Sequence, residues 1–153
     1  MFHYTLINHP ENFSLKEVNI DMIFLWVETE VPLVQKGVLN IAFLSDEEMK
    51  SLNMQYRWLD STTDVLSFHY FDDFHELRAD EVAGEIILSE SRVLSQAKEH
   101  AHTPEKETEI LILHGILHIL WFDHENDTDY AEMWKHEKSL RRKIDTKNKI
   151  SLF

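Results

Sequence analysis

The largely apolar segment ETEILILHGILHILWFDHEND at 107–127 constrains the fold of this chain more than any other part, because it carries histidines at helical spacing. Thr103 and Pro104 supply an N-cap and a proline at the first helical position, which predicts a helix running to about Trp121. His114 and His118 lie four residues apart and therefore share one face of that helix. Two imidazoles on an otherwise apolar helix need either one shared ion or several hydrogen-bond partners.

A third histidine follows the expected end of this helix. His124 lies six residues after His118, in the turn-forming sequence FDHEND. If the chain turns back there, three imidazoles converge on one divalent ion such as zinc and leave a fourth position open for water. The chain has ten histidines and no cysteine, and a single histidine on an apolar face usually only packs. The spacing of these three nevertheless predicts metal binding by His114, His118 and His124.

Gly115 directly follows the first of these histidines and is one of three glycines in the chain. Glycine inside a helix costs about 1 kcal/mol relative to alanine, so its presence needs a reason. A strand or a substrate that approaches the helix backbone would supply one, and tight packing of the helix against a neighbour is an equally good alternative. Zinc peptidases of the HExxH type have glutamate at this position, so peptide hydrolysis by that route is disfavoured.

The rest of the chain alternates between strand-like and helix-like patterns. Ser45 followed by Glu48 is a capping box, which predicts a helix from Asp46 to about Gln55. The predicted strands span residues 2–8, 37–45, 63–70 and 83–89. Besides the helix at 46–55 and the histidine helix at 104–121, helices are predicted at 15–32 and at 89–100, where the second of these begins at residue 89 or 91. A last helix begins at residue 127 or 128 and continues into the C-terminal segment. Interspersed helices and strands predict one domain over residues 1–153, with a four-stranded sheet packed by helices.

The formal charge of −13 is unevenly distributed along the chain. From Trp134 to Phe153 there are seven Lys and Arg residues against Glu137 and Asp145, so this segment carries +5 and the remainder −18. A surface of that sign repels polyanions, which argues against nonspecific nucleic-acid binding through a broad basic face. Any nucleic acid would have to bind at a local basic region. We interpret the basic segment as cations placed favourably near a helix end.

The sequence also predicts where the protein resides. The start lacks a basic region followed by a long apolar run, and the longest uninterrupted apolar stretch, residues 22–27, is too short to span a bilayer. We therefore expect a soluble protein of the cytoplasm.

Outside the histidine segment, few side chains point to chemistry on sequence alone. An arginine such as Arg57 most often forms a salt bridge with an acidic residue. Asp64 is expected to form a hydrogen bond at the entrance of the third strand. Trp26, Trp58 and Trp134 are expected to pack against the protein rather than to stack on bases.

Several of these motifs resemble one known family. HGILHILWFDH at 114–124 resembles the signature HGxLHLxGYDH of the YbeY family, bacterial metal-dependent endoribonucleases of ribosomal RNA maturation. NMQYRWLDSTTDVLSF at 53–68 is similar to the family segment NxxYRxxDxPTDVLSF, and GEI at 84–86 stands where GDI is usual. The matches occur in the family's order over roughly residues 40–140, which is more specific than the histidines alone.

The resemblance implies an α+β fold with a small mixed sheet and a zincin-like metal-binding helix and turn. It also implies that His114, His118 and His124 hold one zinc ion and that Arg57 is the family's functional arginine. The implied activity is single-strand-specific RNA cleavage in 3′-end maturation of small-subunit ribosomal RNA and in ribosome quality control. The partners it implies are RNA and small-subunit ribosomal or assembly proteins, not DNA or a membrane.

Two other functions remain open at this point. The chain could be a ribosome-associated assembly factor whose metal is mainly structural, which a fourth protein ligand such as Glu125 or Asp127 would favour. It could also be a zinc hydrolase of another substrate, which a carboxylate near the metal-bound water would favour. Nickel, cobalt or manganese would suit the same ligands.

Three residues depart from the family pattern. Trp121 stands where glycine is usual, Phe122 replaces the common tyrosine, and His69 occupies a position where proline is frequent. A bulky Trp121 bears on the path of the turn and on access to the metal, although it removes no ligand.

Overall fold

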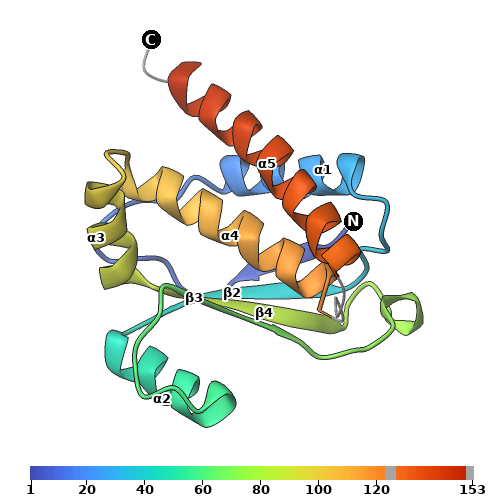
Figure 1. Cartoon of the computed structure of the whole chain (residues 1–153), viewed down its shortest axis with the longest axis horizontal. Coiled ribbons are helices and arrows are strands. Elements are labelled where there is room, and N and C mark those ends of the chain that lie inside the picture. The colour runs from blue at the N-terminus through green and yellow to red at the C-terminus, as the bar shows by residue number, and fades with distance from the viewer. Residues whose placement is uncertain (123–126, 151–153) are drawn as a thin grey trace.

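The four predicted strands form one sheet in a computed structural model, which describes residues 1–122 and 127–150 (Figure 1). The strands are β1 (His3–Leu6), β2 (Val38–Leu44), β3 (Val65–His69) and β4 (Val82–Ser89). Their order across the sheet is β1-β2-β4-β3. β1, β2 and β4 pair in parallel, whereas β3 runs antiparallel to β4. The expected mixed four-stranded sheet is therefore confirmed.

Each predicted helix is also present. The helices are α1 (Glu17–Glu30), α2 (Asp46–Arg57), α3 (Glu90–Glu99), α4 (Pro104–Leu120) and α5 (Asp127–Ile150). The sequence did not predict the short 3-10 helix η1 (Phe74–Glu76), which the Asp73 side chain caps by accepting a hydrogen bond from the His75 amide at 2.9 Å. Among the described helices, none is long and apolar enough to cross a membrane.

Side-chain caps explain why several helices begin where they do. Ser45 and Glu48 form the predicted capping box at the start of α2, with Ser45 Oγ accepting from the Glu48 amide at 3.2 Å. Ser89 caps α3 by accepting from the Arg92 amide. Thr103 caps α4 in the same way, at 3.1 Å from the Lys106 amide. The start of α4, which positions the histidines, is thus set by local sequence.

The sheet separates two apolar layers (Figure 1). Helices α1, α4 and α5 lie on one face, and α2 lies on the other. Alternate side chains of β4 point to opposite faces of the sheet. Ile86 and Leu88 belong to the main core, whereas Ile87 packs with Met49 of α2. The larger layer is the one that contains the histidine helix.

Helix α4 lies between the sheet and α5 and is almost entirely buried. From Glu107 to Leu120 every residue is buried except His114 and His118. A Cβ added at Gly115 would lie 3.0 Å from Cγ2 of Ile86, a fully buried residue of β4. Both alternatives left open for Gly115 therefore apply together, because the neighbour on which the helix packs tightly is a side chain of strand β4. The absence of a side chain there lets α4 pack closely on the sheet.

Charged pairs hold α5 against α4. Lys147 forms an ion pair with the buried Glu109, to which Asn148 also donates a hydrogen bond at 3.1 Å. Lys106 of α4 lies 2.8 Å from Asp145. The basic segment thus does more than place cations at a helix end, because part of its charge neutralises a buried carboxylate.

Candidate metal centre and its pocket

The two helical histidines lie side by side, as their spacing predicts. The ring centroids of His114 and His118 are 4.1 Å apart, and their planes are inclined by 45°. Both are partly exposed, whereas the α4 residues around them are buried. The third predicted ligand, His124, lies outside the described residues, as does Glu125. The shared face of His114 and His118 is therefore confirmed, and their role as ligands stays a prediction.

Glu137 of α5 holds the ring of His114. Its Oε1 accepts a hydrogen bond from Nδ1 of His114 at 2.7 Å, and Glu137 itself is buried. A proton fixed on Nδ1 leaves the lone pair of Nε2 for a metal ion, and a carboxylate is one of the usual partners of the second ring nitrogen in histidine metal ligands. The two residues are 23 positions apart in the sequence, so no local pattern signals the contact. Sequence reasoning consequently missed Glu137.

His114 and Glu137 line a pocket of about 300 Å³. Asp64 also lines it, and accepts a hydrogen bond from the Val65 amide at 2.8 Å, which confirms the expected hydrogen bond at the strand entrance. Arg141 of α5 brings a guanidinium group to the same wall. A candidate metal ligand and a cation that can bind phosphate thus line the same pocket.

Trp134 also lines this pocket and is 51% exposed, and Trp58 is 85% exposed. The prediction that these two tryptophans pack against the protein was therefore wrong, although Trp26 does pack against the core. Trp58 is the C-cap of α2 and adopts a left-handed backbone with φ of 56°. Indole rings with an exposed face are available for stacking.

A second group of metal-ligand side chains lies at the start of α4. Oε2 of Glu107 contacts both Nδ1 of His100, at 3.1 Å, and Nε2 of His102. One donor atom from each of the three residues falls within 4.8 Å of the others, a spacing that one ion can bridge. On sequence alone, Glu107 is a favourable negative charge in the first turn of this helix. The structure buries it and surrounds it with imidazoles.

The structure does not place Arg57 in the pocket that contains His114. It is the last residue of α2, is exposed, and does not line the pocket. Among the described residues it has no ion-pair partner, so the salt bridge expected on sequence alone does not form there. Its guanidinium group is therefore open to an anion.

The departures from the family pattern make contacts of their own. Trp121 is buried, with its ring centroid 5.7 Å from that of His136 in α5. The rings of His69 and Phe122 stack at 3.9 Å between centroids and 24° between planes. Two of the three unusual residues thus contact each other, and the bulk of Trp121 is accommodated in the core.

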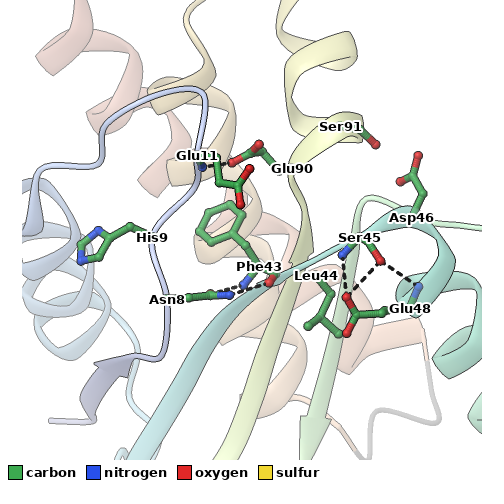
Figure 2. A pocket seen from close by; sticks show the side chains of 10 residues that line it. All are labelled: Asn8, His9, Glu11, Phe43, Leu44, Ser45, Asp46, Glu48, Glu90 and Ser91. Carbon is green, nitrogen blue, oxygen red and sulfur yellow. Dashed lines mark hydrogen bonds between the residues drawn. The ribbon is translucent and has the colours of Figure 1, made fainter.

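A larger pocket, of about 490 Å³, lies where β2 ends and where α2 and α3 begin, and acidic side chains line it (Figure 2). Structural hydrogen bonds occupy many of its polar groups, including those of Asn8 with Phe43 and the capping box of α2. Hydroxyl donation from Ser89, and then from Ser91, lowers the pKa of Asp46 at its edge. Of the residues predicted to act in chemistry, those that the structure describes, His114, His118 and Arg57, do not line this pocket.

Comparison with known proteins identifies the relatives of this chain. A family model described as Endoribonuclease YbeY matches residues 8–145. An Endoribonuclease YbeY of Fusobacterium nucleatum is 36% identical over 135 residues, 87% of this chain and 78% of that protein. The Endoribonuclease YbeY of Alkaliphilus oremlandii is 30% identical over 139 residues, 87% of this chain and 91% of that protein.

A solved structure agrees with these matches. A Thermotoga maritima protein determined in solution superimposes with a TM-score of 0.60 at 26% sequence identity. The superposition covers 99% of this chain and 93% of the other. The similarity in fold thus extends over the whole domain.

Proposed function

This chain belongs to the YbeY family of endoribonucleases, and on that premise we propose that it is a metal-dependent hydrolase that cleaves single-stranded ribosomal RNA. The proposed metal ligands are His114, His118 and His124, and the proposed ion is zinc. One metallohydrolase domain spans residues 1–153. The proposed biological role is 3′-end maturation of small-subunit ribosomal RNA and ribosome quality control in the cytoplasm.

The observation that carries this proposal is the exposure pattern of α4. Two histidines, His114 and His118, interrupt an otherwise buried run from Glu107 to Leu120, and a buried Glu137 orients the first of them. This arrangement fits a metal site, because the donors are neutral imidazoles with an outer carboxylate partner. When bound, a divalent ion supplies Lewis acidity that acidifies water and stabilises negative charge on phosphate oxygens.

The pocket beside His114 supports a single-stranded RNA substrate. Arg141 can hold a phosphate with its fork of donors, and the exposed ring of Trp134 offers a platform for an unpaired base. Bases are available for stacking only where RNA is not paired, so such a pocket favours single strands. The chain's own residues would thus position the scissile phosphate near His114 and His118.

Arg57 remains the proposed functional arginine through its match to the family segment. Its support in this structure is an exposed guanidinium group without an ion-pair partner among the described residues. It sits outside the pocket, so we propose that it contacts RNA beyond the scissile phosphate.

The charge of the chain supports delivery of RNA by protein partners. A net charge of −13 repels a free polyanion over most of the surface. We propose that ribosomal small-subunit or assembly proteins supply the specificity that broad phosphate attraction cannot. The isolated protein is then expected to show only a modest salt dependence of RNA binding.

The experiment that tests this function is cleavage of a small-subunit ribosomal RNA 3′-precursor fragment. Wild type is compared with His118→Ala, Arg57→Ala and Arg141→Ala, with metal content measured for each preparation. His75→Ala and Lys138→Ala are matched controls, because both residues are exposed and lie outside the pocket. We expect wild type and controls to cut, His118→Ala to be inactive, and the arginine variants to cut weakly while keeping their metal.

Two results would reject the proposal. Equal cleavage by wild type and His118→Ala would show that the activity does not depend on the proposed metal site. Metal-loaded wild type that binds the RNA without cutting it would favour an assembly factor instead.

A further inference from the structure

Helix α4 forms one wall of the pocket, and at each end of this wall a histidine contacts a glutamate through a hydrogen bond. His114 and Glu137 lie at one end, and His100 and Glu107 lie at the other. We propose that His100, His102 and Glu107 bind a second divalent transition-metal ion, distinct from the ion at His114 and His118. Whether this ion binds does not depend on the proposed function. Its proposed effect, attracting the phosphates of RNA, rests on that function.

The donor set is suited to such an ion. Two imidazole nitrogens and one carboxylate oxygen form the ligand set of open zinc sites, which keep a further position for water or substrate. Here Nδ1 of His100 and Nε2 of His102 both contact the same oxygen of Glu107. Each nitrogen presents its lone pair to an ion once the ring proton moves to the other nitrogen. A small movement of the carboxylate then places the ion between the three donors.

The turn between α3 and α4 brings the two histidines together. His100 caps α3, and Ala101 adopts a left-handed backbone with φ of 56°. The amide of His102 reaches back to the carbonyl of Ala97 at 3.1 Å, which completes the turn. The two rings consequently lie 5.4 Å apart between centroids. An alanine in this conformation costs about 1 to 2 kcal/mol, yet the chain uses one here.

Burial and charge explain what a cation adds. Glu107 is 2% exposed, and a neutral imidazole donates a hydrogen bond to it without supplying charge. The same pocket is lined by two further carboxylates, Asp64 and Glu137, against the single guanidinium group of Arg141. A divalent ion on Glu107 cancels this excess of negative charge at the wall that a phosphate must approach.

Helix geometry separates the two ions. Glu107 and His114 are seven residues apart on α4, which places their backbones about 10 Å apart along the helix axis. The metal ions of two-metal catalytic sites are about 3.5 to 4 Å apart. The second ion is therefore too distant to share the reacting oxygens, and acts on RNA by attracting phosphate.

The test is a calorimetric titration of the metal-depleted full-length chain with Zn²⁺ alone, with bound zinc measured after removal of excess. The proteins are wild type, His102→Ala, His102→Gln, His118→Ala, the double variant His102→Ala/His118→Ala, and His75→Ala. His102→Gln keeps a donor for Glu107 and guards against a loss of folding. His75 is the matched control, because it pairs with Asp73 at 2.9 Å on the surface. Circular dichroism verifies that each variant is folded.

We expect two zinc ions per chain in wild type and His75→Ala, one in His102→Ala, His102→Gln and His118→Ala, and none in the double variant. One ion in wild type that is lost in His118→Ala and kept in both His102 variants would overturn the second site, leaving an ordinary buried hydrogen-bonded group. One ion that is lost in both His102 variants and kept in His118→Ala would support this site while rejecting the metal site of the proposed function.

Discussion

The two ends of α4 carry the same residue types but assemble them differently. Toward its C-terminal end, His114 and His118 are aligned by the helix itself, and Glu137 reaches one of them from α5. At the N-terminal end, Glu107 of the helix receives His100 and His102 from the preceding turn. The pair His114 and His118 is aligned by the helical repeat alone, whereas the contacts of Glu107 require one particular conformation of the preceding turn. Removing single side chains should therefore have different consequences at the two ends.

The largest difference is expected in cleavage. His118→Ala should lower kcat for the ribosomal RNA fragment by at least about 100-fold. Loss of a residue that hydrogen-bonds to a metal ligand already lowers activity by about 10- to 100-fold, and loss of the ligand itself should lower it further. His102→Ala should act mainly by raising KM, because the second ion attracts phosphate without reaching the reacting oxygens. Steady-state cleavage of the two variants at one salt concentration measures this split. If the two variants lose kcat equally, the two ends of α4 do not differ in function.

The next effect concerns the carboxylate behind His114. Glu137→Gln should weaken zinc binding at the His118-dependent site by about 10- to 100-fold, because the amide holds the ring without the negative charge. Glu132→Gln on the same helix is the control, since Glu132 is exposed. Competition with a chelator gives the affinity of each variant. Unchanged affinity in Glu137→Gln would make the Glu137–His114 hydrogen bond purely structural.

Packing under the C-terminal group can be tested through Gly115. Gly115→Val should lower the free energy of unfolding by about 1 to 3 kcal/mol, because even a Cβ there would lie 3.0 Å from the buried Ile86. Urea denaturation measures the change. A variant as stable as wild type would mean that α4 can move away from β4, and that the histidines are held less rigidly than the contact indicates.

The corresponding change at the N-terminal end should have the opposite sign. Ala101→Gly should raise the free energy of unfolding by up to about 1 kcal/mol, because glycine adopts a φ of 56° without the steric cost of a Cβ. The same urea denaturation applies. Destabilisation would indicate that the alanine methyl group makes a contact that outweighs the backbone cost.

The smallest effect lies away from α4, at the acidic pocket of Figure 2. Asp46→Asn should destabilise the protein by no more than about 1 kcal/mol, because Asp46 is largely exposed. The folded chain lowers the pKa of Asp46 from 3.8, mainly through the Ser89 hydroxyl. The stabilisation is thus present above that ordinary value and is lost as pH falls through the lowered one. Urea denaturation of both proteins at pH 7 and pH 3 should show the difference shrinking, and a constant difference would assign it to another cause.

Local sequence signals predicted much of the fold. The capping box at Ser45 and the Thr103-Pro104 pair located two helix starts, because caps act on backbone groups within three residues. The i, i+4 spacing of His114 and His118 predicted their adjacency for the same reason. η1 was missed because its short sequence carries no periodic pattern. The exposure of Trp58 and Trp134 was missed because apolar character alone does not tell which side of an element meets solvent.

By itself, the sequence determined the order of helices and strands, the family, and the pair of histidines on α4, because these depend on neighbouring residues or on motif spacing. The tertiary structure alone decided that Glu137 contacts His114, that Glu107 is buried with His100 and His102, and that Ile86 explains Gly115. The Ile86 and Glu137 contacts join separate elements, and the His100 and His102 contacts depend on the conformation of one turn. The contacts between separate elements form only when packing brings those elements together, and the turn depends on a left-handed alanine that the sequence pattern does not predict.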